Sequence, residues 1–188
     1  MGDIVLYAKK SCVQCKKAIA FLNSNATGKY KSIYGYNDSS DHLRAPGTSL
    51  TAIGLLLRYY IDGWRTETPG FAEGVTGLMP LAPSPQAKPF FDIYFYYYAT
   101  QVVRFYGKEE WSTWNEGPKA ADGSRKGGIQ DWLISLQDRS PGDRGSWSPD
   151  AGVVGPFSGR LGTTAFCLLT LEVYYRYSPE NANDPKKP

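Results

Sequence analysis

The tyrosine-rich run between residues 91 and 101, FDIYFYYYATQ, carries the side chains best suited to binding chemistry. Tyr94, Tyr97, Tyr98 and Gln101 follow at offsets of 0, 3, 4 and 7, which places them on one helix face. Aromatic rings line apolar cavities, and their faces attract cations. The sequence therefore predicts a ligand-lining face with these candidate contacts: Asp92, Tyr94, Tyr98, Gln101 and Trp64. The alternative is that the tyrosines fill a core and hydrogen bond locally.

The cysteines and the histidine of this sequence do not predict a metal site or a disulfide framework. Cys12, Cys15 and Cys167 are the only cysteines, and an odd number predicts no disulfide framework. Catalytic zinc needs three protein ligands and an open position, yet the single histidine, His42, lies in a polar loop. Cys167 stands among apolar residues and is expected to be a small buried side chain. We therefore expect no metal and no cofactor.

Length, charge and hydropathy exclude several classes of protein. The chain has 188 residues, which suits one domain. Its net charge of +3 is small and dispersed, so we expect no nucleic-acid partner. No apolar run approaches the roughly 18–20 residues of a membrane span, so no transmembrane segment is expected. The first residues, MGDIVLYAKKSC, do not read as a signal peptide, and the expected localisation is cytoplasmic.

The chain carries three long segments that are apolar nearly all round, which is typical of buried helices. These segments are residues 49–64, 96–107 and 162–177. A shorter, more amphipathic segment precedes each one: residues 15–24, 70–79 and 127–138. One such pair cannot cover its own apolar helix. The pattern predicts stacked helix pairs, with the apolar helices inside and the amphipathic helices outside.

A Gln, a Gly and a Trp follow the third outer helix in LISLQDRSPGDRGSW. Gln137 is expected in the last helical turn, where backbone carbonyls lack partners, and its amide can donate to them or to the next helix. Gly145 permits a close approach of the chain at the turn. Trp147 can lie over the amide plane and hold the loop in place. We interpret Gln137, Gly145 and Trp147 as a structural motif without chemistry.

Several segments, in the same order, resemble the squalene-cyclase-like proteins with prenyltransferase/squalene-oxidase repeats. KGGIQDWLISLQDRSPGDRGSW resembles the Gln-Trp repeat motif of squalene and oxidosqualene cyclases, and RLGTTAFCLLTLEVYYRYSP resembles the inner helix that follows it. SIYGYNDSS, GTSLTAIGLLLRYY and FDIYFYYYATQVVRFYGKEEWSTWN are similar to segments of the bacterial members. The resemblance runs from about Lys16 to Pro179. It implies an all-α fold, a partial α/α-toroid of about three inner/outer helix pairs over residues 1–179, with a disordered tail at 180–188.

The same resemblance implies a binding domain more readily than a reaction. The Asp-x-Asp-Asp acid of the cyclases is absent, and its nearest counterpart is Asp38 with Asp41 in a polar turn. The zinc-holding Asp, Cys and His of protein prenyltransferases are absent too. The first hypothesis is a toroid domain that binds an isoprenoid or other apolar ligand in an aromatic cavity. Since half a ring exposes its inner helices, we expect a homo-oligomer or a missing N-terminal half.

Two other functions stay open. The first is a non-catalytic helical-repeat scaffold that presents an arc for protein binding. The second depends on DIVLYAKKSCVQCKKAIAFLNS, which is similar to the start of glutaredoxin-like reductases. That similarity would make Cys12 the attacking thiolate and Cys15 the resolving thiol. The toroid and the reductase both claim the helix at 15–24, so only one of them can hold.

Overall fold

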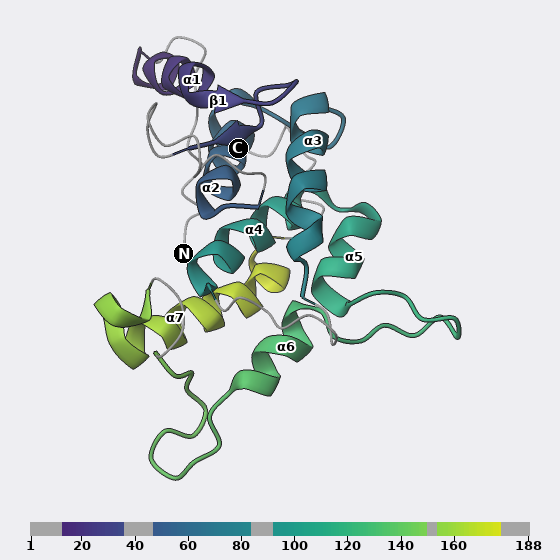
Figure 1. Cartoon of the computed structure of the whole chain (residues 1–188), viewed down its shortest axis with the longest axis vertical. Coiled ribbons are helices and arrows are strands. Elements are labelled where there is room, and N and C mark those ends of the chain that lie inside the picture. Colours follow the sequence, from purple (N-terminus) through teal and green to yellow (C-terminus); the bar gives the residue numbers. More distant parts are fainter. Residues whose placement is uncertain (1–12, 36–46, 84–91, 150–153, 178–188) are drawn as a thin grey trace. The chain divides into compact units, whose positions relative to one another are not determined.

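The computed structural model describes residues 13–35, 47–83, 92–149 and 154–177 and is mostly helical. Of these residues 65% are in helices and 4% in strands, which confirms the all-α class (Figure 1). The chain divides into two compact units, Met1–Leu78 and Met79–Pro188, each described here by itself. The toroid arrangement and the domain boundaries at 179 and 180 stay predictions.

The first unit is built around α2. Its elements are α1 (Val13–Asn25), β1 (Ala26–Thr27), β2 (Ile33–Tyr34), α2 (Ser49–Leu57), the π-helix η2 (Arg58–Asp62) and α3 (Pro69–Leu78). The two strands pair antiparallel, with Ala26 opposite Tyr34. The Thr48 hydroxyl starts α2 by accepting the Thr51 N–H at 3.2 Å, since a threonine at this position satisfies an otherwise unpaired donor. A Cβ at Gly54 would collide with the Tyr34 ring, so this glycine lets β2 approach α2 closely.

A buried arginine joins three elements of the first unit. Arg58 is 1% exposed. Its guanidinium donates to the Tyr34 hydroxyl at 2.8 Å, to Asp62 at 2.8 Å and to the Asn23 amide oxygen at 2.6 Å. Its carbon also lies 4.9 Å from the Trp64 ring centroid. Because a buried charge is tolerated only when it is paired and hydrogen bonded, this network is the reason that an arginine can occupy the core.

The second unit contains the tyrosine-rich helix and the C-terminal helix. Its elements are η3 (Met79–Leu81), α4 (Ile93–Tyr106), α5 (Lys108–Glu116), α6 (Ile129–Leu136) and α7 (Gly155–Arg176). Pro156 stands at the start of α7, where its missing N–H is not needed. Gly159 has φ 61° and ψ −166°, so α7 is kinked there, between a short helical segment at 155–158 and the long helix that follows.

Helices α4 and α7 lie side by side and run in the same direction (Figure 1). Near the start of α4, Tyr94 and Tyr97 contact Phe166 of α7. Farther along α4, Phe105 contacts Tyr177. Contacts that advance together along both helices require a parallel pair.

All six predicted helical segments are helices, but with different limits. The segment 49–64 divides into α2 and η2, and the segment 127–138 shortens to α6, ending at Leu136. Helix α5 was not predicted, because KEEWSTWNE carries only two buried tryptophans and no long apolar stripe. The expectation that 162–177 is a buried helix is wrong for one side of it: Leu168, Tyr174 and Tyr175 are 46%, 46% and 81% exposed. Residues 178–188, including the predicted tail, lie outside the described residues.

Candidate functional site

The predicted aromatic face exists as a cluster of rings on α4 and α7. The ring of Tyr94 lies 5.0 Å from that of Tyr98 and 5.9 Å from that of Phe166, centroid to centroid. Tyr97 lies 5.0 Å from Tyr98 and 5.3 Å from Phe166. All four side chains are half-buried. Their edge-to-face contacts give the cluster its own stabilisation, so part of it serves as core packing.

Burial raises the pKa values of two of these tyrosines. It raises the pKa of Tyr98 to about 12, with a smaller contribution from Tyr94, and it also raises the pKa of Tyr97. Both phenols therefore stay neutral at physiological pH.

The two polar residues predicted beside the rings are engaged within the protein. Gln101 is 3% exposed; its amide nitrogen donates to the Tyr97 carbonyl at 3.2 Å, and its oxygen accepts from the Tyr177 hydroxyl at 3.3 Å. Asp92 is 6% exposed and caps α4, accepting the Tyr94 N–H at 3.1 Å. These contacts give both residues a structural task, and their predicted role as ligand contacts stays a prediction.

The structure gathers four of the five candidates on α4, whereas Trp64 belongs to the first unit. The Trp64 ring packs against Gly70, where an added Cβ would lie 2.5 Å from the ring. Arg58 covers its face. This environment accounts for Trp64 as a packing residue of the first unit.

The Gln-Gly-Trp motif is a structural clamp, but its contacts differ from those expected. Gln137 follows α6 in an extended conformation and donates to the Gly145 carbonyl at 2.9 Å, inside the loop. Trp147, 2% exposed, donates from its indole nitrogen to the Leu133 carbonyl of α6 at 2.8 Å. Trp147, and not Gln137 as the sequence predicted, therefore donates to a backbone carbonyl in the last turn of α6. Position 145 favours glycine because its φ is +88°, which other residues rarely adopt. A Cβ there would meet open space, so the expected close approach of the chain is not the reason.

Most residues of the other hypotheses fall outside the described part of the chain. Cys12, Asp38, Asp41 and His42 lie there. Cys15 is half-exposed in the first turn of α1. Cys167 is buried, and burial raises the pKa of its thiol to about 12. Within the described ranges, no three His, Cys, Asp or Glu side chains form a group suited to a metal ion.

Two features of the second unit were missed by sequence reasoning. The first is the exposed apolar stripe on α7, formed by Leu161, Leu168 and Tyr175. Its signal was available, since these residues stand seven apart, which is nearly two helical turns. Because the segment is apolar nearly all round, the sequence does not distinguish the exposed residues of the stripe from the residues that pack inside.

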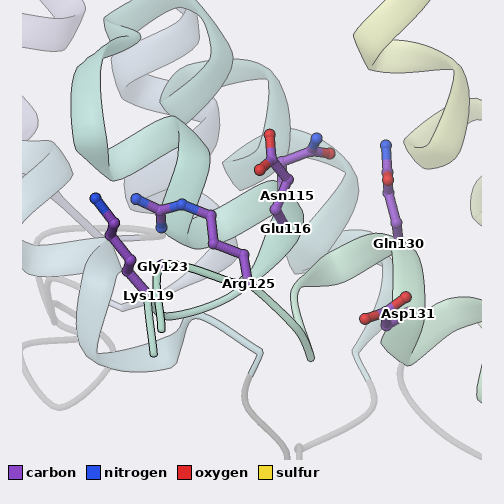
Figure 2. Close-up of a pocket in the computed structure, with 7 residues that line it drawn as sticks. All are labelled: Asn115, Glu116, Lys119, Gly123, Arg125, Gln130 and Asp131. Carbon is purple, nitrogen blue, oxygen red and sulfur yellow. The ribbon is translucent and has the colours of Figure 1, made fainter. Parts of the chain in front are cut away.

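The second missed feature is a polar hollow of about 470 Å³ where α5 ends and α6 begins (Figure 2). Six polar side chains line it: Asn115, Glu116, Lys119, Arg125, Gln130 and Asp131. No pattern in the sequence marked it, because the loop between Gly117 and Gly128 reads as an ordinary surface turn.

Comparison of the chain with models of protein families, with characterised proteins and with solved structures finds no match. Among the helices that the structure describes, none combines the length and the apolar character needed to cross a membrane.

Proposed function

We propose that this chain is a squalene-cyclase-like helical-repeat domain that acts by protein association, through a face of α7 that pairs with a second copy of the chain. The observation that carries the proposal is the exposed stripe of Leu161, Leu168 and Tyr175. The opposite side of α7 is used within the unit, where Thr163, Cys167, Thr170 and Val173 are buried. One side of α7 is therefore buried within the unit, and the apolar stripe on the opposite side is exposed in the part of the chain that the structure describes.

Repeat architecture explains why the uncovered side needs an occupant. Helices of a repeat array are covered by their neighbours. One face of α7 presents two leucines and a tyrosine that no described neighbour covers. Exposed apolar side chains aligned along one helix face are typical of association surfaces in soluble proteins.

The spacing of the stripe favours a second copy as its occupant. Leu161 and Tyr175 each stand seven residues from Leu168, on either side of it. A twofold axis through Leu168 would therefore place two α7 helices antiparallel, with Leu161 against Tyr175 and Leu168 against itself. A surface that is self-complementary in this way is what a symmetric dimer requires.

The charges at the ends of the stripe are compatible with this pairing. The axis would bring Arg160 towards Arg176 of the second copy. Arg160 is already paired with Asp138 at 3.2 Å and Asp143 at 3.3 Å, and Arg176 lies 4.0 Å from Glu172. Each guanidinium therefore carries its own acidic partner, which reduces their mutual repulsion.

The test is the oligomeric state of the full chain, measured by sedimentation equilibrium over a range of concentrations. We expect a dimer for the wild type. Leu168→Glu should raise the dimer dissociation constant by on the order of 100-fold, because the axis places the two new carboxylates together. Ile134→Glu is the matched control, an apolar side chain 53% exposed on α6, and it should leave the dimer intact. A monomeric wild type, or equal effects of the two variants, would refute the proposal.

A second candidate, an isoprenoid ligand on the α4–α7 aromatic face, is favoured by the half-buried ring cluster of Tyr94, Tyr97, Tyr98 and Phe166. Farnesol or squalene should then raise the Tm of the chain in a saturable way. Tyr98→Ala should reduce that rise, whereas Phe157→Ala, 89% exposed and away from the cluster, should not. The absence of any shift at saturating ligand would count against this function.

A further inference from the structure

The polar hollow between α5 and α6 contains a buried side chain whose hydrogen-bonding groups are unused. Asn115 is 4% exposed and lines the hollow. In the described part of the chain, no hydrogen bond to its side-chain amide is formed. Its amide atoms are not sealed from solvent, so water in the hollow can satisfy them in the free protein. An amide with free groups at the wall of a hollow is therefore in place to bind a molecule that enters it.

The backbone around Asn115 is held so closely that the hollow is preformed. A Cβ at Gly128 would collide with the Asn115 carbonyl oxygen, and one at Gly117 would collide with the Lys126 carbonyl oxygen. The hairpin between these glycines is closed by an antiparallel bridge between Lys119 and Arg125. A ligand would therefore meet a site that is already formed, which reduces the entropic cost of binding.

The charges of the hollow are separated across it. Figure 2 shows Lys119 and Arg125 on one side, Gln130 and Asp131 on the other, and Asn115 with Glu116 between them. Arg125 is engaged, donating to the Gly117 carbonyl at 2.9 Å and pairing with Glu109. Lys119 makes no ion pair among the described residues, so its ammonium group is available.

Both signs of charge face the hollow, so a simple ion does not fit it. Glu116 and Asp131 would repel an anion, and Lys119 would repel a cation. The start of α6 adds a partner for a carboxylate. Its N-cap residue is Gly128, which has no side chain to accept from the first backbone N–H groups of the helix. A molecule that carries a carboxylate and an ammonium group satisfies both sides together.

We propose that this hollow binds a small zwitterion of the α-amino acid class, with Lys119 and the α6 N-terminus on its carboxylate, Glu116 and Asp131 on its ammonium group, and Asn115 at its centre. Because Arg125 is paired with Glu109, Lys119 is the one lining cation left for a carboxylate in the described part of the chain. An acidic side chain would lack a partner, so the expected amino acid has a neutral side chain. This site lies apart from the α7 stripe and does not depend on the proposed dimer.

The test titrates the full chain with glycine, serine, asparagine and glutamine while the side-chain amide signals of Asn115 and Gln130 are followed by ¹⁵N NMR. At least one amino acid should move both signals saturably at concentrations below about 10 mM. Its N-acetyl and carboxamide analogues, each lacking one charge, should bind at least about tenfold more weakly. No saturable shift, equal binding of the analogues, or tighter binding of glucose would overturn the proposal.

Variants separate a binding role from a structural one. Lys119→Ala should weaken binding about tenfold, whereas Lys126→Ala, an equally exposed lysine of the same hairpin that does not line the hollow, should not. Asn115→Leu should abolish binding and leave the Tm of the free chain within about 2 °C of the wild type, because the amide it removes makes no hydrogen bond within the described residues. A larger fall in Tm for Asn115→Leu, or a loss of binding with Lys126→Ala, would contradict the assignment.

Discussion

Two buried amides of the second unit show that pairing, more than burial, distinguishes a binding residue from a packing residue. Gln101 and Asn115 are 3% and 4% exposed. The amide of Gln101 donates to Tyr97 and accepts from Tyr177, so a ligand would have to replace bonds that already exist. The amide of Asn115 has no such bonds to lose. At the scale of single residues, Asn115 is the stronger candidate for contact with a ligand.

The buried tyrosines of α4 lead to a pH prediction at the same scale. Burial raises the pKa values of Tyr96 and Tyr98 to about 12, whereas an unfolded tyrosine ionises near its ordinary value of about 10. As pH rises from about 10 to 12, the unfolded state loses these protons first. The free energy of unfolding should therefore be unaffected below pH 10 and fall between pH 10 and 12.

Urea unfolding at several pH values, together with phenolate absorbance of the native protein, checks this expectation. The absorbance should reveal tyrosines that ionise only near pH 12. Tyr98→Phe should make the fall in stability shallower, because it removes one of the groups that ionise late. Ionisation of every tyrosine near pH 10 in the native protein would contradict the assigned burial.

At the scale of elements, the loop between α6 and α7 is held by contacts from both helices. Trp147 donates to Leu133 of α6 through its indole and to the Thr164 hydroxyl of α7 through its backbone N–H, at 2.8 and 3.2 Å. Arg160 of α7 adds contacts to Asp138 and to the Ser146 hydroxyl. These bonds fix the loop between the two helices, so α6 and α7 behave as one hairpin.

The motif predicts unequal effects of substitution at its two ends. Trp147→Phe leaves a buried carbonyl of α6 without its donor and should lower the free energy of unfolding by about 2 kcal/mol. Gln137→Ala removes an exposed bond that water can replace, and should cost about 0.5 kcal/mol. Urea unfolding of both variants measures the difference. Equal costs would contradict this expectation and would show that the glutamine stabilises the loop as much as the tryptophan does.

At the scale of the whole molecule, the proposed dimer links stability to concentration. If α7 pairs with a second copy, the Tm of the wild type should rise with protein concentration, because association stabilises the folded state. The Tm of Leu168→Glu should not change with concentration. A concentration-independent Tm in both proteins would argue for a monomer.

The sequence by itself determined the helical class and the approximate places of six helices. Periodicity and apolar composition are local properties, so 49–64, 96–107 and 162–177 could be identified as helices without knowledge of their neighbours. The α4 face of Tyr94, Tyr97, Tyr98 and Gln101 was found for the same reason. The Gln137–Trp147 motif was identified as structural from its residue types and its place after a helix.

Only the tertiary structure decided which of these side chains are hydrogen bonded or buried within the protein and which are exposed. Partners such as Leu133 for Trp147 and Tyr177 for Gln101 lie far along the chain or in another element. The hollow at Asn115 arises because Gly117 and Gly128 bring two backbone segments into contact. The exposed side of α7 depends on where α4 covers it. Hydrogen-bond pairing and burial are properties of packed neighbours, and no local pattern records them.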